Sequence, residues 1–384
     1  MDRREKIIAL FGRYENGDFS AKNRFLRSAT WLAGSDDTSG EMSFAEISRT
    51  AEVAAGGAGT VITGTAYVSP EGKFLPRQWG IHCDSRIKDV AKLSEAAHKY
   101  GSKLIVQLSH GGGQRNESVI GDTVTIGPSD LVHPGRNFSS KAMTADDIKR
   151  VRADFASAAL RAKEGGADGV EIHAGHGFLF TQFLSPVTNI RDDSYGGALE
   201  NRARFLREAV SDVKEALGSS FQVWVKLSIS EGTECGYKAE EGINTAKLLL
   251  SDGADAIEVS NGTIYSDALH MPSVIGVSEG ESEAPSKEYS LCLKKYAKQG
   301  QTIILTGGNR SLASMSDLVF DGFCDLLGMS RPFNAEPDLI NRWAEEDSRP
   351  SACLSCNACF GTAAKGIVDC PIIRDRNEGF WDPL

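Results

Sequence analysis

Residues 168–210, DGVEIHAGHGFLFTQFLSPVTNIRDDSYGGALENRARFLREAV, form the segment that points most directly to an architecture. They open with a short β-rich run and then present His173 and His176 in a glycine-rich turn. Strands of a parallel α/β barrel deliver polar side chains to a site in this way, at their carboxyl ends. Both histidines are therefore candidate site residues. A core histidine beside a loop histidine is the alternative, and a metal pair is disfavoured because no third ligand lies at a suitable spacing.

The surrounding sequence repeats one pattern eight times: a short apolar, β-branched run, a loop and an amphipathic helix. Eight such units predict an α/β fold, a (β/α)8 TIM barrel. The predicted strands cover residues 24–28, 59–63, 103–108, 169–172, 222–227, 256–259, 302–305 and 325–328. The predicted helices cover residues 44–55, 87–100, 145–164, 201–217, 239–250, 287–299, 311–320 and 336–345.

Several polar or small residues lie at the ends of these strands, where a barrel places its site. Ala29 and Thr30 follow the first strand, and Thr65 follows the second. Gln107 and Lys226 lie inside otherwise apolar strands, where a polar group without a partner is costly. We predict cofactor contacts at these five positions. For Lys226, an inward salt bridge with a barrel carboxylate is the alternative.

Two glycine-containing loops follow the seventh and eighth predicted strands. One contains Gly307, Gly308 and Asn309, and the other contains Ser330 and Arg331. Barrels commonly bind phosphate with these two loops, because glycine lets the backbone approach an anion and arginine adds charged donors. The sequence therefore predicts a phosphate-bearing cofactor. A sugar phosphate would use the same loops, so a sugar-phosphate enzyme is the rival interpretation.

The composition is that of an ordinary globular protein of 384 residues, with 41% hydrophobic and 24% charged residues. A net charge of −10 argues against nucleic-acid binding, which needs a basic surface. The apolar run near the N-terminus is too short for a signal peptide or a membrane span, so we expect a cytoplasmic location and no membrane partner. We predict one barrel over residues 1–345 and a cysteine-rich extension over residues 346–384.

The extension carries four of the eight cysteines, in the pattern C-x2-C-x2-C followed by a more distant C-P. The pattern suits a [4Fe–4S] cluster or tetrahedral zinc, and metal-free thiols or a disulfide remain a third alternative. The other four cysteines are scattered and fit buried small side chains. The predicted metal ligands are Cys353, Cys356, Cys359 and Cys370.

The ordered motifs HAGHG, FLSPVTNIRDDSYGG and ENRARFLREAV closely resemble the signature of the Old Yellow Enzyme family, over residues 23–343. Members of this family are FMN-dependent NAD(P)H:flavin oxidoreductases. The resemblance implies that Gln107 and Lys226 contact the flavin ring, with Lys226 near its N1/C2 edge, and that the two glycine loops bind the FMN phosphate. It also implies that His173 and His176 hydrogen-bond the carbonyl oxygen of an α,β-unsaturated small-molecule substrate.

One residue departs from the family pattern. Phe178 occupies the position after the motif's glycine, where the family usually has the tyrosine that protonates the substrate. A phenyl ring cannot donate a proton. Three explanations stay open: Tyr67 or Tyr265 donates instead, water donates, or the natural reaction is not ene reduction but isomerisation, oxidation or removal of a leaving group. We expect simple enone reduction to be slow.

The cysteine tail resembles the segment after the barrel in dienoyl-CoA reductase and trimethylamine dehydrogenase, where four cysteines hold a [4Fe–4S] cluster. Those relatives continue into a dinucleotide-binding half that this sequence does not contain. We therefore expect either direct reduction by NAD(P)H or delivery of electrons by a donor protein. The alternative function is that of a non-catalytic electron-transfer subunit. A homo-oligomer is compatible with the sequence, although the predicted outer helices show no pattern that specifies one.

Overall fold

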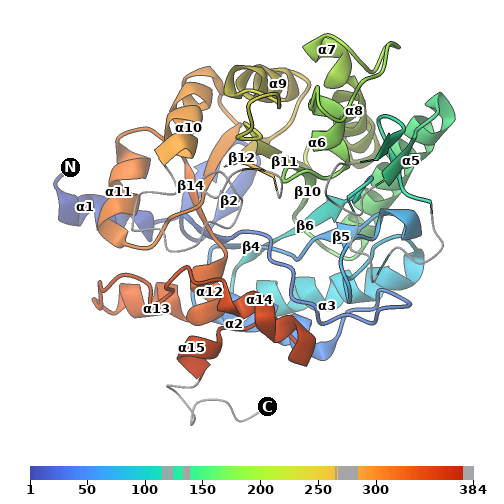
Figure 1. The fold of residues 1–384 in the computed structure, drawn as a ribbon. Coiled ribbons are helices and arrows are strands. Elements are labelled where there is room, and N and C mark those ends of the chain that lie inside the picture. The colour runs from blue at the N-terminus through green and yellow to red at the C-terminus, as the bar shows by residue number, and fades with distance from the viewer. Residues whose placement is uncertain (115–118, 120–123, 133–138, 264–265, 267–283, 375–384) are drawn as a thin grey trace.

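The computed structural model describes residues 1–114, 119, 124–132, 139–263, 266 and 284–374 (Figure 1). Its centre is a closed barrel of eight parallel strands, because β10 pairs with β11 on one side and with β6 on the other. The predicted TIM barrel is confirmed, with every strand in its predicted place. The strands are β3 (Phe25–Arg27), β4 (Thr60–Ile62), β6 (Lys103–Ser109), β10 (Gly169–Ala174), β11 (Gln222–Ser228), β12 (Ala256–Ser260), β13 (Thr302–Thr306) and β14 (Leu326–Met329).

Helices follow the strands and cover the outside of the barrel (Figure 1). They are α2 (Phe44–Ala55), α3 (Ile87–His98), α5 (Ala145–Glu164), α7 (Leu199–Arg202), α8 (Arg204–Leu217), α9 (Ala239–Ser251), α10 (Ala284–Tyr296), α11 (Leu312–Phe320), α12 (Arg331–Ala335) and α13 (Leu339–Ala344). Within the described residues, no helix is long and apolar enough to span a membrane.

The last predicted helix, over residues 336–345, is wrong at its start. The chain forms two short helices, α12 and α13, and Glu336 between them has an extended φ of −141°. Pro337 explains the break, because the residue before a proline is driven out of the helical region. A second short helix, α6 (Leu179–Leu184), follows β10 inside a segment that was predicted as loop.

The amino end of the barrel is closed by elements that the periodicity did not predict. Helix α1 (Arg3–Leu10) contacts α11, and a hairpin of β1 (Tyr14–Asn16) and β2 (Phe19–Ala21) lies below the strands. The ring of Phe19 meets Trp224 edge-on at 5.0 Å. The hairpin therefore caps the apolar floor of the barrel.

The interior of the barrel is layered. Its lower layer is apolar and consists of Leu26, Ile62, Ile105, Trp224, Ala256, Ile304 and Leu326. Side chains alternate in and out along a strand, so the next inward position lies two residues further on. On five of these strands that position is polar. The upper layer thus contains Ser28, Gln107, Lys226, Glu258 and Thr306, and it forms the floor of the site.

The cysteine extension packs against the barrel with α14 (Ala358–Gly361) and α15 (Pro371–Arg374). The backbone N–H of Val368 donates to the carbonyl of Leu32 at 2.7 Å, and Arg77 donates to two carbonyls of the extension. Val368 and Cys359 are buried in a small apolar cluster with Leu32 and Ala33. The extension is therefore anchored to the loop that follows the first barrel strand.

Candidate active site

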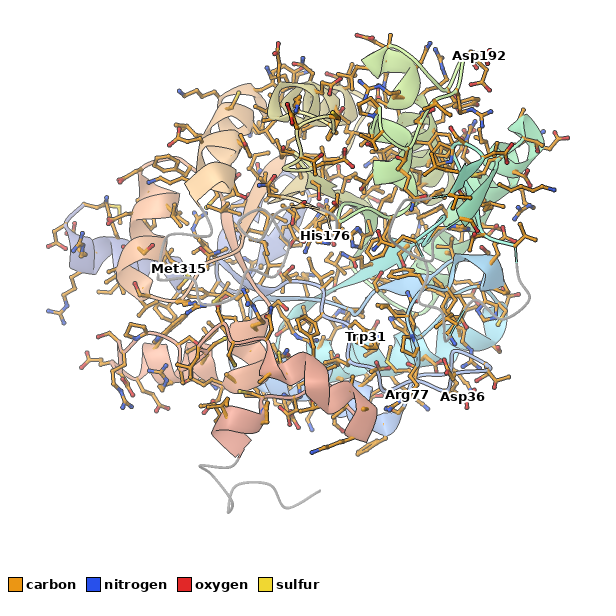
Figure 2. The ribbon with its side chains drawn as sticks, viewed as in Figure 1. Trp31, Asp36, Arg77, His176, Asp192 and Met315 are labelled. Carbon is orange, nitrogen blue, oxygen red and sulfur yellow. The ribbon has the colours of Figure 1, made fainter. Side chains whose placement is uncertain are left out.

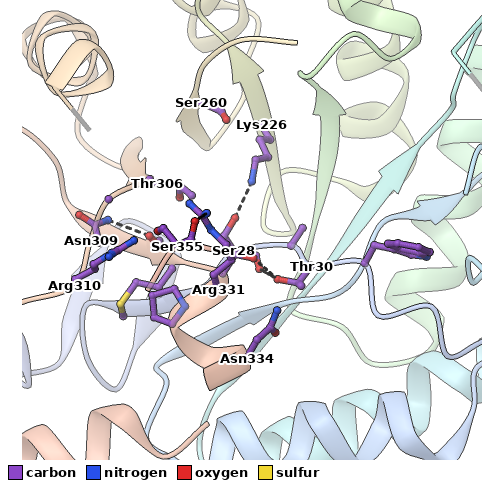
Figure 3. A pocket seen from close by; sticks show the side chains of 18 of the residues that line it. Ser28, Thr30, Lys226, Ser260, Thr306, Asn309, Arg310, Arg331, Asn334 and Ser355 are labelled. Carbon is purple, nitrogen blue, oxygen red and sulfur yellow. Dashed lines mark hydrogen bonds between the residues drawn. The ribbon is translucent and has the colours of Figure 1, made fainter. Parts of the chain in front are cut away.

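A cavity of about 210 Å³ lies at the carboxyl ends of the strands (Figure 3). It is bordered by the loops after β3, β13 and β14 and by the ends of β11 and β12. This is the place that barrel enzymes use for catalysis. Nine of the predicted site residues line it: Ala29, Thr30, His176, Lys226, Gly307, Gly308, Asn309, Ser330 and Arg331.

One end of the cavity has the features of an anion cradle. Gly307 and Gly308 both have positive φ, at +116° and +72°, and space is open above Gly307. Asn309 donates its amide to the carbonyls of Leu305 and Gly328, at 2.9 and 3.0 Å. Its Oδ1 is buried and has no hydrogen-bond partner among the described residues. A bound group with a donor would satisfy this oxygen.

Two guanidinium groups, those of Arg310 and Arg331, border the same end. Burial lowers the pKa of Arg331, and the neighbouring charge of Arg310 lowers it further. Two like charges in one cavity are stabilised by an anion, and a phosphate matches the guanidinium geometry. The hydroxyls of Thr30 and Ser330 lie 2.7 Å apart and tie the loops after β3 and β14 together. These residues fit the phosphate end of FMN.

Lys226 forms the opposite, inner wall. Its Nζ lies 2.7 Å from Ser28 Oγ and 2.7 Å from Glu258 Oε1, as Figure 3 shows in part. Glu258 is the cross-strand neighbour of Lys226 and is fully buried. The inward salt bridge considered for Lys226 is therefore present, while the side chain still faces the cavity. Glu258 was not among the predicted site residues, although a glutamate within the apolar run AIEVS was a visible signal.

Gln107 lies below the cavity, in the polar layer. Its Nε2 donates to Glu171 Oε2 at 2.6 Å, and both side chains are buried. Burial and the nearby Glu258 raise the pKa of Glu171 well above its ordinary value. Burial also acts to raise the pKa of Glu258, but Lys226 and hydrogen bonds outweigh it and bring that pKa to about 2. Glu258 is thus the ionised member of the carboxyl pair.

The two histidines lie next to each other, with ring centroids 5.0 Å apart and planes at 89°. Nδ1 of His173 accepts the N–H of Gly175, so the proton of the neutral ring lies on Nε2. Nε2 of His176 lies 2.7 Å from Ser260 Oγ. Burial lowers the pKa of His173 well below its ordinary value and that of His176 to about 3, with Lys226 contributing to both. Both rings are neutral at pH 7.

The backbone of His176 is unusual, because its φ of +62° lies in the left-handed region. Its N–H donates to Ser228 Oγ at 2.9 Å, and its backbone bridges to Thr263. These contacts hold the strained residue in place and aim its ring at the cavity. In Figure 2, His176 lies near the middle of the view, with Trp31 below it toward the C-terminal helices.

Phe178 stacks against Phe74 with ring centroids 4.1 Å apart, and its ring meets that of His173 at 5.0 Å. Tyr67 is buried, its ring stacks on His82, and burial raises its pKa to about 12. Its hydroxyl points at Gly40, away from the cavity lining. Thr65 lies after β4, where its carbonyl accepts from Gln78, and it does not border the cavity either. Tyr265 lies outside the described residues.

The four cysteines of the extension border a second, smaller hollow beside the first. They form no disulfide. In the described part of the chain, no three His, Cys, Asp or Glu side chains are placed to hold a single metal ion. Arg331 and Asn334 border both hollows, and Arg331 donates to Asn357 Oδ1 at 2.8 Å. The cysteine cluster and the anion cradle therefore share a wall.

Fold and cavity together define a TIM-barrel enzyme whose site lies over the carboxyl ends of its strands. Residues 9–349 match the model of the NADH:flavin oxidoreductase / NADH oxidase family. The chain belongs to this family, that of Old Yellow Enzyme, and it is an oxidoreductase for which FMN and NAD(P)H are the fitting cofactors.

Three similar proteins illustrate the relationship. NADPH dehydrogenase of Bacillus subtilis is 35% identical over 64% of this chain and 71% of its own length. NADH oxidase of Thermoanaerobacter brockii is 31% identical over 92% of this chain and 53% of its own. A solved complex of 2-naphthoyl-CoA reductase superposes with a TM-score of 0.87 at 26% identity, over 98% of this chain and 58% of that one. The chain thus spans about half the length of the latter two proteins.

Proposed function

We propose that this chain binds FMN in the larger cavity and transfers hydride equivalents from NAD(P)H, or from another electron donor, to an α,β-unsaturated carbonyl compound. One observation carries the proposal: the cavity has an anion cradle at one end and a buried lysine at the other. That is the charge pattern of a phosphorylated flavin, whose ring gains negative charge on reduction. When bound, FMN supplies hydride chemistry that amino-acid side chains cannot.

The chain's own residues would divide the binding as follows. Gly307, Gly308, Arg310 and Arg331 would hold the phosphate. The unsatisfied Oδ1 of Asn309 is an acceptor and would take a hydroxyl of the flavin's side chain rather than the phosphate. Lys226 provides a fixed positive charge at the inner wall. Because Glu258 and Ser28 hold its Nζ, this charge is preorganised and needs little rearrangement when negative charge develops nearby.

His173 and His176 would bind the substrate's carbonyl oxygen. Their depressed pKa values keep both rings neutral, so each acts as a hydrogen-bond donor rather than as a source of full positive charge. Donors aimed at a developing enolate oxygen lower the barrier for hydride addition at the β-carbon. Phe178 cannot supply the proton for the α-carbon, and Tyr67 faces away from the cavity. Water and Tyr265, which lies outside the described residues, are the donors left for an enone substrate.

The test is the absorption spectrum and flavin content of anaerobically purified protein. We expect bound FMN, about one per chain, and we expect Arg310→Ala with Arg331→Ala to weaken FMN binding on the order of 100-fold, because two charge-assisted contacts are lost. Arg204→Ala, a change on the outer surface, is the matched control. A colourless protein that binds a sugar phosphate in the same cradle would contradict the proposal and favour the rival enzyme class.

We further propose that Cys353, Cys356, Cys359 and Cys370 hold a [4Fe–4S] cluster, with zinc as the alternative. One observation supports this: all four thiols border one hollow. The spacing C-x2-C-x2-C with a more distant fourth cysteine suits either group. Iron and acid-labile sulfide counted per chain decide the matter, and zinc alone, or no metal, would contradict the cluster.

A further inference from the structure

A charged layer lies directly behind the inner wall of the cavity. Glu258 is fully buried, and its Oε1 accepts hydrogen bonds from both Lys226 Nζ, at 2.7 Å, and Ser28 Oγ, at 2.5 Å. Lys226 and Ser28 border the cavity, so Glu258 acts on its contents through them. The oxygens Oε2 of Glu258 and Oε1 of Glu171 have no hydrogen-bond partner among the described side chains other than each other's carboxyl.

This layer can be assigned its charges. Glu171 is buried against a second carboxyl, which favours its protonated form, while Lys226 keeps Glu258 ionised. Gln107 and Ser28 are neutral, and so are the two histidines above. One proton is therefore held by the carboxyl pair, and the positive charge of Lys226 is offset by one negative charge directly behind it.

We propose that Glu258 is a positioning residue that fixes Lys226 Nζ at the flavin wall and offsets its charge, and thereby lowers the reduction potential of the bound flavin. The inference rests on the proposed function in one respect, the placement of the flavin ring beside Lys226. A lone buried cation would favour the negatively charged reduced ring strongly, because Coulomb energies are large away from water. A paired cation favours it less. The chain thus keeps a preorganised lysine without the high potential that an uncompensated lysine would give.

The experiment measures the midpoint potential of FMN in the full-length holoprotein. Glu258→Gln keeps an oxygen that can accept from Lys226 but removes the charge, and we expect it to raise the two-electron potential by about 30 mV or more, which corresponds to a tenfold change in the reduction equilibrium. Lys226→Met should lower the potential. The double variant Lys226→Met/Glu258→Gln removes both charges, so its potential should lie below that of Glu258→Gln.

Two matched controls test the charge assignment. Glu171→Gln replaces a carboxyl that already carries a proton, so it should shift the potential by much less than Glu258→Gln does. Asp255→Asn removes a carboxylate from the other end of β12, where Asp255 pairs with Lys214 at 2.8 Å, and should leave the potential unchanged. If Glu171→Gln had the larger effect, the assignment of charge to Glu258 would be overturned.

The outcomes separate this inference from the function on which it rests. If Lys226→Met leaves the potential unchanged, Lys226 does not contact the flavin and that part of the proposed function fails. If Lys226→Met lowers the potential but Glu258→Gln does not raise it, only the role of Glu258 fails. Removing one partner of a buried ion pair is destabilising, whereas replacing both is often tolerated. If Glu258→Gln does not fold, Glu258→Asp gives the second comparison: the shorter side chain keeps the charge but withdraws it from Lys226 Nζ, so the potential should rise by a smaller amount, and an unchanged potential would contradict the role of Glu258.

Discussion

At the scale of single residues, we predict that Phe178 makes the reduction of a simple enone slow. Its ring lies 5.0 Å from that of His173. A tyrosine at this position would therefore place its hydroxyl next to the proposed substrate site. We expect Phe178→Tyr to raise the rate of cyclohexenone reduction at least about tenfold, since a positioned general acid is typically worth 10²–10⁴. Steady-state kinetics with NADPH measure this, with Phe178→Leu as the control. A wild-type rate that is already high and a tyrosine that adds nothing would contradict the expectation.

His176 makes the folded protein sensitive to acid. Burial lowers its pKa to about 3, whereas an unfolded histidine titrates near 6.5, so between these values the unfolded chain binds the extra proton. The contribution of neutral His176 to the free energy of unfolding is complete above pH 6.5 and is lost as the pH falls toward 3. We expect His176→Asn to reduce the loss in free energy of unfolding between pH 7.5 and pH 5 by about 1–2 kcal/mol. Urea titrations at the two pH values measure this, and an unchanged loss would contradict it.

Residue types and strand positions were enough to predict nine of the twenty residues that line the cavity. Lys226 and the glycines of the phosphate loops were predictable because a barrel fixes which strand ends share a site. Glu258 was not predicted, because its partner lies on a neighbouring strand and pairing depends on register. Tyr67 was considered as a replacement for the missing proton-donor tyrosine, but the direction of its side chain, which places its ring on His82, is set by packing.

At the scale of elements, we predict that bound metal depends on the cysteines of the extension and not on cysteines elsewhere in the chain. Cys356 is exposed and borders the smaller hollow, and Cys235 is exposed but lies alone on a loop. We expect Cys356→Ser to lose most of the bound iron and Cys235→Ser to lose none, because a cluster needs all four thiolates. Iron and sulfide analysis of anaerobic samples measures both. Equal iron in the two variants would contradict the assignment.

The elements themselves were predictable to different degrees. The eight strands were found because a buried parallel strand is a short, nearly continuous apolar run. The hairpin of β1 and β2 was missed because its strands, YEN and FSA, contain no apolar run. The boundary between α12 and α13 was missed although Pro337 marks it.

At the scale of the whole molecule, the extension and the barrel should unfold together. Val368 is fully buried against Leu32, in the loop that also supplies Ala29, Thr30 and Trp31 to the cavity. We expect Val368→Ala to lower the free energy of unfolding by about 2 kcal/mol, from lost burial of two methyl groups and the cavity left behind. The unfolding midpoint followed by circular dichroism and the midpoint of flavin release should fall by the same amount. A shift in one signal alone would contradict a single cooperative unit, and Val187→Ala, at a partly exposed position, is the control.

Closure of the barrel has a consequence for synthesis of the chain. β3 lies near the start of the sequence and pairs on one side with β14, about 300 residues later. As the chain emerges from the ribosome, the free edge of β3 therefore waits, unpaired, until residues 326–329 have been made. Over the same interval the partner of α1, helix α11, is also missing. The nascent chain exposes an unpaired strand edge for most of its translation, so we expect this stage, rather than the finished barrel, to be the one most prone to aggregation.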